Sequence, residues 1–144
     1  MTSKADILLP CAALVALTAV VWVRLYVVRL AEIAEKKIEP QSVRNSRLGA
    51  DAFERVEAAD NFKNLFEVPV LFYALCASLA ASEQVTPFFV AGAWLFVALR
   101  ALHSFIHCTY NVVMHRFAVY AAGTVLIFAM WGVFAFRLIA LRAV

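Results

Sequence analysis

Four side chains able to bind a ligand or take part in catalysis recur at helical spacing in the third apolar segment of this chain. Tyr110 lies ten residues after Arg100, with His103 and His107 at offsets of three and seven between them. These offsets place all four on one narrow face of an α-helix. A charge near the centre of a bilayer costs about 2.5–3.5 kcal/mol, and it usually persists because it is paired or used. This face is therefore the first candidate for a functional site.

A second polar set precedes the second apolar segment. Asp60, Asn64 and Glu67 are spaced by four and three residues, which again favours one helical face. Further polar side chains stand near the ends of the first and fourth apolar segments: Arg24, Arg116 and Tyr120. All of these residues fall toward the same predicted side of the membrane. We therefore expect one polar site, built by several helices and opening toward that side.

The chemistry of this set suits a small zwitterion that carries carboxylates. Arginine recognises carboxylates through its planar fork, while a carboxylate such as Glu67 can hold an ammonium group. The chain has no hydrolase-type nucleophile and base pair, no P-loop and no GxGxxG motif. Haem is disfavoured because His103 and His107 share one helix, and no acidic residue joins their face to complete a metal site. We predict no bound metal.

Each polar residue also has a structural interpretation. Arg24 and Arg29 are typical of side chains that extend toward the membrane interface. Glu67 and Arg100 can form an ion pair between the second and third spans, and each histidine alone is typical of a hydrogen-bonded core residue. The clustering of these residues, more than any one of them, favours a site.

The composition identifies the elements that must position these residues. The chain has 144 residues, of which 65% are hydrophobic and 16% charged, and its mean hydropathy is +0.83. Soluble domains average about 45–50% apolar and 25% charged residues, so the composition indicates a membrane protein. Each spanning helix needs roughly 20 apolar residues. We predict an all-α, integral membrane four-helix bundle, one domain over residues 1–144, with spans at about 7–28, 65–81, 87–109 and 117–140.

The basic residues predict the orientation of the bundle. Most Lys and Arg lie between the first two spans, in a loop over about residues 29–60 and just beyond it. The positive-inside rule places this loop in the cytoplasm and both termini outside it. Acidic residues balance the loop, which argues against a polybasic lipid-binding patch and against a nucleic-acid partner. The expected partner is the lipid bilayer.

The same loop and the cysteines allow two further predictions. Residues 40–49 have the polar and helix-breaking character of irregular chain. From Asp51 onward, Phe53, Val56, Ala59 and Phe62 can form an apolar stripe at helical spacing, so the second span should start well before its apolar part and project into the cytoplasm as a helix. The three cysteines, which lie far apart in or beside apolar segments, are expected to be buried thiols: Cys11, Cys76 and Cys108.

Three motifs together resemble the MAPEG family, the membrane-associated proteins in eicosanoid and glutathione metabolism. The first, at the start of the second span, is Phe53-Glu54-Arg55-Val56 followed by Asn64-Leu65-Phe66-Glu67-Val68-Pro69. A further motif, Arg100-x-x-His103-x-x-x-His107 followed by Arg116 and Tyr120, is similar to the spacing in prostaglandin E synthase-like members. The last, Val23-Arg24-Leu25, resembles the first-helix arginine of that group. The motifs extend over nearly the whole chain, and their common order carries the resemblance.

The resemblance implies a homotrimer that binds glutathione, as co-substrate, between neighbouring subunits near the cytoplasmic face. Carried over by position, the glutathione site would contain Arg24, Asn64, Glu67, Arg100, His103 and Tyr120. His107 replaces the usual tyrosine, and Tyr110 lies one turn further on, where it can substitute. Arg116 would lie beside the thiol and lower the pKa of that thiol, so that thiolate is available at neutral pH.

The residues leave three functions open. The first is a glutathione-dependent transferase or peroxidase acting on lipophilic electrophiles or hydroperoxides. The second is a non-catalytic lipid-binding or regulatory membrane protein on the same scaffold, which Asp60 and His107 favour because they depart from the family pattern. The third is a small transporter or proton-conducting bundle, against which the apolar run 125–136 argues. These departures indicate a divergent bacterial member, so we expect residence in the bacterial inner membrane.

Overall fold

The computed structural model describes residues 2–142 and contains four helical rods that are long and apolar enough to cross a membrane. The first is α1 (Lys4–Lys36) and the second is divided into α3 (Glu57–Asn64) and α4 (Val68–Ala81). The third and fourth are α5 (Pro87–Cys108) and α6 (Val113–Arg142). No strand occurs in the described part of the chain, and the all-α prediction with four spans is confirmed.

Local sequence accounts for several helix ends. The backbone N–H of Ser3 donates to the carboxylate of Asp6 over 2.6 Å, which satisfies a free donor where α1 begins. Proline occupies the first turns of α4 and α5, where its missing N–H costs nothing. Lys37 ends α1 in a left-handed conformation with φ of 51°, a common way to close a helix.

One prediction about the first loop is wrong and another is confirmed. Residues 40–49 were expected to be irregular but are partly helical, with a short 3₁₀ turn η1 (Pro40–Val43) and the helix α2 (Ser46–Ala52). The helix of the second span does begin well before its apolar part, at Glu57, although Phe53 has an extended backbone and lies outside that helix. Asn45 explains why α2 forms: its side chain accepts the backbone N–H of Leu48 over 3.0 Å and caps the helix.

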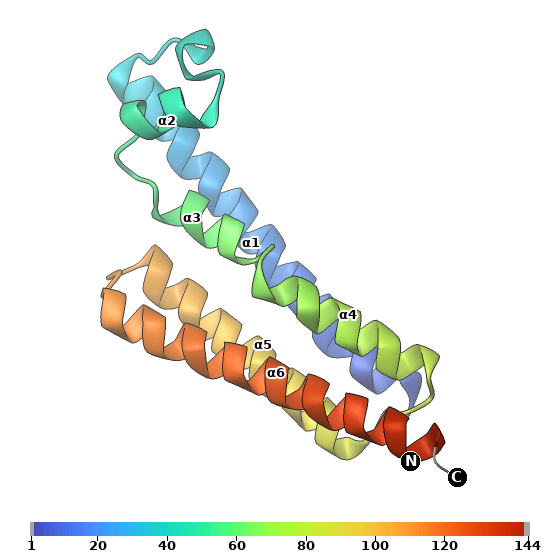
Figure 1. Cartoon of the computed structure of the whole chain (residues 1–144). Helices are drawn as coiled ribbons and strands as arrows, with labels where there is room; N and C mark the ends of the chain where they lie inside the picture. The colour runs from blue at the N-terminus through green and yellow to red at the C-terminus, as the bar shows by residue number, and fades with distance from the viewer. Residues whose placement is uncertain (1, 143–144) are drawn as a thin grey trace.

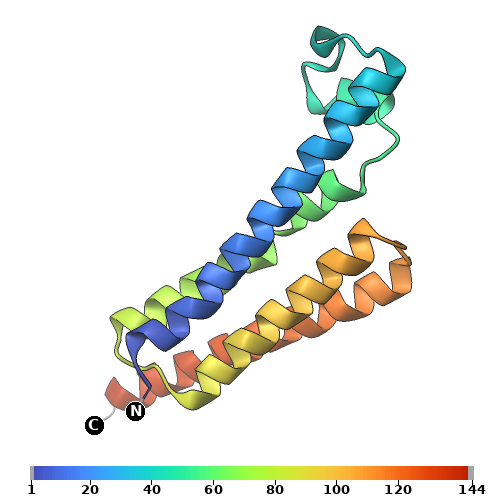
Figure 2. The same ribbon diagram turned by 180° about the vertical axis from the view of Figure 1, so that it is seen from behind.

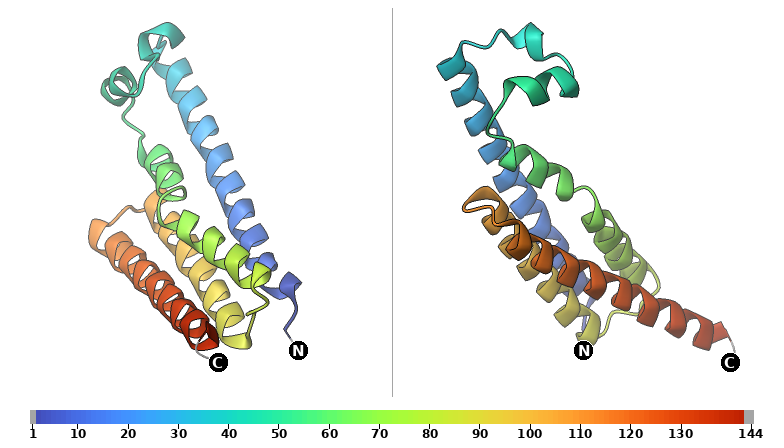
Figure 3. Two further views of the ribbon diagram at one scale, coloured as in Figure 1. Left: turned by 45° about the vertical axis from the view of Figure 1, so that its right-hand side comes forward. Right: turned by 60° about the vertical axis from the view of Figure 1, so that its left-hand side comes forward.

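The rods form two antiparallel pairs that lie side by side (Figures 1 and 2). In one pair α1 packs along α3 and α4, and in the other α5 packs along α6. Both described ends of the chain lie beside the α4–α5 connection; we call this the terminal end. The opposite end carries residues 37–56 and the α5–α6 connection, and we call it the loop end. Figure 3 shows that α1 extends past the α5–α6 connection there.

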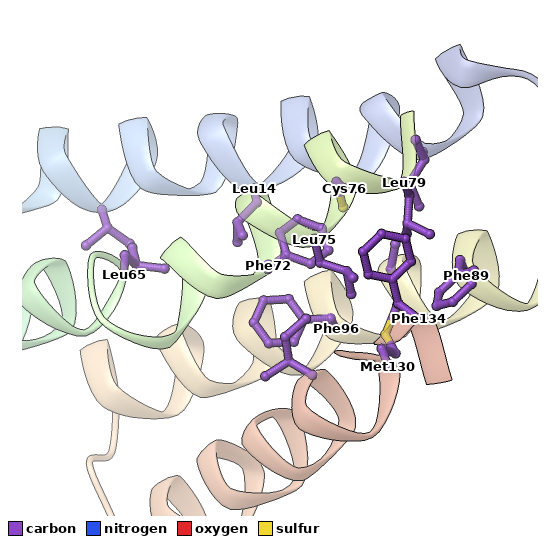
Figure 4. Packing of buried hydrophobic residues seen from close by; sticks show 14 residues of the cluster. Leu14, Leu65, Phe72, Leu75, Cys76, Leu79, Phe89, Phe96, Met130 and Phe134 are labelled. Atoms are coloured by element: carbon purple, nitrogen blue, oxygen red, sulfur yellow. The ribbon is translucent and has the colours of Figure 1, made fainter. Parts of the chain in front are cut away.

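The apolar core lies mainly in the terminal half of the bundle (Figure 4). Phe72 of α4 stacks on Phe96 of α5, with ring centroids 4.8 Å apart, and both are fully buried. Met130 of α6 packs so closely on Gly92 that a Cβ there would lie 2.9 Å from the Met130 sulfur. Glycine at position 92 therefore permits the close approach of α5 and α6. This packing fixes the register in which the polar residues nearer the loop end meet.

The last turns of α1 hold the first loop in place. With 33 residues, α1 is about 50 Å long at 1.5 Å per residue, whereas the hydrocarbon core is about 30 Å thick. The helix α1 is therefore longer than the hydrocarbon core is thick, and its charged residues from Arg29 onward gather in its last turns. There the buried carboxylate of Glu32 accepts the backbone N–H of Glu54 over 2.8 Å and pairs with Lys36, also over 2.8 Å. Hydrogen bonds from Lys36 and Glu54 lower the pKa of Glu32 to about 2.

Candidate functional site

Arg100 lies inside the bundle and takes part in no ion pair among the described residues. Its residue is 1% exposed, and both terminal nitrogens of its guanidinium are buried without a hydrogen-bond partner in the described part of the chain. The guanidinium carbon lies 4.6 Å from the ring centre of Tyr120 and 5.1 Å from that of Phe96. Aromatic faces attract cations, but more weakly than a carboxylate does. Arg100 is therefore a buried cation whose hydrogen-bonding capacity is unused.

Gly123 of α6 gives this guanidinium its space. A Cβ at position 123 would lie 3.4 Å from Nη2 of Arg100, which is a tight contact. Because α5 and α6 pack along their length, the lack of a side chain at Gly123 leaves space for the guanidinium of Arg100 between the two helices.

One turn toward the loop end, two histidines meet Arg116 of α6. Nδ1 of His103 is 3.2 Å from the backbone carbonyl of Arg116, so Nδ1 carries the proton and Nε2 is an acceptor. Nε2 of His107 accepts from Nη1 of Arg116 over 2.6 Å, so the proton of His107 lies on Nδ1. The remaining nitrogen of each ring is buried without a partner among the described residues. The pair thus presents one free acceptor and one free donor.

A third layer connects α3, α5 and α1. Asn61 is fully buried, accepts a hydrogen bond from Ser104 over 3.2 Å and donates to the sulfur of Cys108 over 3.5 Å. Arg24 donates to the backbone carbonyl of Cys108. Sequence reasoning missed Asn61 and Ser104. Ser104 follows directly after His103, and Asn61 lies three residues before Asn64, so helical spacing was the available signal for Asn61.

The other residues expected in the site lie further out. Asn64 is half-buried, and Glu67 is exposed at the break between α3 and α4. Tyr110 is 52% exposed and its ring lies 5.9 Å from that of His115, in the α5–α6 connection. Asp60 forms an ion pair with Lys63 over 3.3 Å. Of the residues expected in the site, the structure therefore brings together those on α5 and α6: Arg100, His103, His107, Arg116 and Tyr120. Arg24 reaches the end of α5 through the carbonyl of Cys108.

Tyr120 joins the deep and the middle layers. Its ring covers the guanidinium of Arg100 and lies 5.6 Å from the ring of His103. The whole cluster is polar on the inside: Arg100, His103 and His107 are each at most 3% exposed. The cluster therefore holds buried hydrogen-bonding groups on Arg100, His103 and His107 that have no partner among the described residues. Among the described residues, no group of histidine, cysteine and carboxylate side chains is arranged to hold a metal ion.

Comparison with known families identifies this architecture. The MAPEG family model matches residues 7–136, nearly the whole chain. The chain belongs to the MAPEG family. No curated protein and no solved structure matches it.

Membership and the four apolar helices make the chain an integral, multi-pass membrane protein. MAPEG proteins generally use glutathione and are generally trimeric. Membership places this chain, in general terms, among the membrane proteins of glutathione or eicosanoid metabolism. The family relation also gives the buried polar cluster its interest. A soluble core tolerates a buried arginine more easily than a bilayer does, where an uncompensated charge is costly.

Proposed function

We propose that this MAPEG protein is a glutathione-dependent transferase or peroxidase that acts on lipophilic electrophiles or hydroperoxides. The observation that carries the proposal is the guanidinium of Arg100, which is buried with both terminal nitrogens free. A carboxylate is the partner that the planar donor fork of arginine fits best. Glutathione has two carboxylates, and one of them would satisfy Arg100.

The histidines and Arg116 would then activate the thiol. The free Nε2 of His103 is a buried acceptor that can take the thiol proton. The guanidinium of Arg116, held by His107 and by Asn111 over 2.9 Å, supplies positive charge that favours the thiolate. The thiolate sulfur would bond to an electrophilic carbon and displace its leaving group with the bonding electron pair. With a hydroperoxide, it would attack the terminal oxygen and break the O–O bond, which gives glutathione sulfenic acid and an alkoxide; the alkoxide takes the proton held by His103 and leaves as an alcohol. A second glutathione would then reduce the sulfenic acid, giving glutathione disulfide and water. His107 thus takes over the position that the family resemblance gives to a tyrosine.

A homotrimer would complete the site. Glu67, which the resemblance assigns to glutathione, is exposed on a single chain, and it makes no ion pair with Arg100 among the described residues. An exposed carboxylate on a spanning helix is costly when it faces lipid. A neighbouring subunit at this face would shield Glu67 and place it beside a ligand shared between the two chains.

The alternative function is a non-catalytic lipid-binding or regulatory membrane protein, and one cavity is compatible with it. A groove of about 430 Å³ between α1 and the α3–α4 rod is lined almost entirely by apolar and aromatic side chains, including Trp22, Phe62, Phe66 and Tyr73. Its size lies within the range of small-molecule sites, about 300–1,000 Å³. The groove would hold a lipid chain in either function, as substrate in the first and as the sole ligand in the second.

Glutathione titration of the detergent-solubilised protein separates the two functions. We expect saturable binding by calorimetry, together with the ultraviolet absorbance of a bound thiolate near neutral pH. S-methylglutathione should bind without that absorbance, because it has no ionisable thiol. Arg116→Ala should lose the absorbance and keep most of the binding, and Arg137→Ala, at the terminal end of α6, is the matched control. No binding at millimolar glutathione, with lipid retained through purification, would favour the alternative function.

We also propose that the loop end faces the cytoplasm, as the distribution of Lys and Arg predicts. Single cysteines at Arg47 and at Glu83, in a background free of the native cysteines, test this in intact bacterial cells. A membrane-impermeant maleimide should label Glu83→Cys directly and Arg47→Cys only after permeabilisation. The reverse pattern would place the glutathione site on the outer face, away from the cytoplasmic glutathione pool.

A further inference from the structure

A second cavity, separate from the polar cluster, lies at the loop end between the last turns of α1, the first loop and α3. Its volume is about 770 Å³, within the range of small-molecule sites. The loop that forms its outer wall is seen above α3 in Figure 3. The site residues Arg100, His103, His107 and Arg116 do not line it. It therefore belongs to a different part of the molecule from the proposed glutathione site.

The charged residues on the wall leave an excess of positive charge. The wall carries three cations, Arg29, Arg44 and Lys63, and one carboxylate, Asp60. Asp60 is paired with Lys63, so it is not free to neutralise the arginines. Neither Arg29 nor Arg44 takes part in an ion pair among the described residues. Two uncompensated guanidinium groups therefore share one cavity.

Arg29 is held ready for an anion. Its guanidinium carbon lies 3.8 Å from the ring centre of Phe53, also on the wall, and this contact fixes the head against an aromatic face. Its Nη1 is buried without a hydrogen-bond partner in the described part of the chain. A buried donor without a partner costs free energy unless a ligand or water satisfies it. An anion in this cavity would accept a hydrogen bond from the unpaired Nη1 of Arg29 and neutralise its charge. The contact with Phe53 already holds the guanidinium in position.

Ion pairs elsewhere in the loop explain why the sequence hides this excess. Glu32 is bound by Lys36 and by the backbone of Glu54, and Glu35 pairs with Arg55 over 2.8 Å. These carboxylates balance the loop when charges are counted along the chain, but they do not face the cavity wall. The structure separates the paired charges from the two arginines that face the cavity.

We propose that this cavity binds a phosphate-bearing anion, with its charge held between Arg29 and Arg44. Arginine binds phosphate oxygens through paired N–H donors, and the cavity lies beyond the apolar stretch of α1, at the depth of lipid headgroups. Apolar side chains such as Val43, Val56 and Phe53 also line it, which suits a headgroup with attached carbon. The phosphate comes from an anionic phospholipid or from a soluble phosphate, and the experiment distinguishes these two sources.

The test is thermal unfolding of the detergent-solubilised protein with three probes: dioctanoyl phosphatidylglycerol, dioctanoyl phosphatidylcholine and inorganic phosphate. Stabilisation by phosphatidylglycerol that phosphatidylcholine does not reproduce identifies the lipid source. Stabilisation by inorganic phosphate alone identifies the soluble source. Equal effects of the two lipids, without an effect of phosphate, would overturn the proposal. Glutathione should not compete with either probe, so failure of the glutathione proposal leaves this result intact.

Matched arginine variants locate the site. Arg44→Gln, on an exposed loop residue, should weaken the apparent affinity for the effective probe about tenfold, as expected when a charged hydrogen bond is lost. Arg29→Gln should do the same, and Arg29→Lys should recover part of the affinity by restoring the charge. Arg47→Gln, three residues from Arg44 but off the cavity wall, should leave the affinity unchanged. An equal loss in Arg47→Gln would show general charge attraction and overturn the proposal.

Discussion

Replacing Arg100 with methionine should raise the unfolding temperature of the unliganded protein and abolish its stabilisation by glutathione. Methionine is flexible and similar in length, so it can fill the space between Phe96, Tyr120 and Gly123 without the charge. Buried ionic groups replaced by apolar side chains of similar volume often leave proteins equally or more stable. The same change removes the donors that we assign to a glutathione carboxylate. One substitution therefore changes stability and binding in opposite directions.

The size of the stability effect follows from the contacts of Arg100. The charge lies past the middle of α5, where its insertion cost is at most about 2.5–3.5 kcal/mol. Contacts with the Tyr120 and Phe96 rings, at 4.6 and 5.1 Å, return about 0.5–1 kcal/mol each. The net gain for Arg100→Met is then about 1 kcal/mol, or a rise in unfolding temperature of about 4 °C.

Thermal unfolding in detergent with and without glutathione measures both effects. At a concentration 100 times its dissociation constant, glutathione should stabilise the wild type by about 2.7 kcal/mol, and this increment should vanish in Arg100→Met. Arg137→Met, at the opposite end of the bundle, controls for loss of an arginine. If Arg100→Met unfolds at a lower temperature and keeps the full glutathione increment, Arg100 is a structural residue and the reasoning fails.

Three further predictions follow from the packing and the first loop. Gly123→Ala should lower glutathione affinity several-fold, because the new Cβ would lie 3.4 Å from the guanidinium of Arg100. Gly132→Ala, with nothing within 4 Å of its Cβ, should leave the affinity unchanged. Calorimetric titration with glutathione compares the two variants. Asn61→Leu should lower the free energy of unfolding by about 1–3 kcal/mol because it leaves buried hydrogen-bond partners unsatisfied, and Asn64→Leu should cost less; equal losses in thermal unfolding would contradict this. Because the pKa of Glu32 falls from 4.5 to about 2 on folding, its stabilisation of the first loop is present above pH 4.5 and lost as the pH falls toward 2. Hydrogen exchange in the first loop should be slower in the wild type than in Glu32→Gln above pH 4.5, and this difference should disappear as the pH falls toward 2. A difference that does not change with pH would refute the role given to the Glu32 carboxylate.

The sequence predicts the membrane fold better than it predicts the loop. Apolar length alone locates the four spans, because the bilayer demands about 20 apolar residues from each. The helix before the second span was expected from a stripe that included Phe53, yet Phe53 turns out of the helix and packs under Arg29. Helical spacing in the local sequence cannot predict this contact, because Arg29 lies on α1, far from Phe53 along the chain.

The candidate site divides in the same way. Spacing within α5 placed Arg100, His103 and His107 on one face correctly, because they share a single continuous helix. Sequence spacing did not single out Asn61, which is the fully buried amide of α3 within one chain, whereas Asn64 is half-buried and Glu67 is exposed. The break at 65–67 changes the helical phase between α3 and α4, so no single 100° period describes the whole second span. Hydrogen bonds between helices, such as that from Ser104 to Asn61, require the tertiary structure.

Arg100 and Glu67 carry opposite charges, and neither takes part in an ion pair among the described residues. Arg100 is buried with free donors, and Glu67 is exposed on a spanning rod, yet the two form no ion pair among the described residues. Opposite charges in a spanning bundle usually pair with one another when their role is structural. Keeping them apart costs free energy in a bilayer, and a zwitterion can compensate both at once, with its carboxylate on the arginine and its ammonium on the glutamate. The separation of Arg100 from Glu67 therefore favours a ligand site over a structural ion pair.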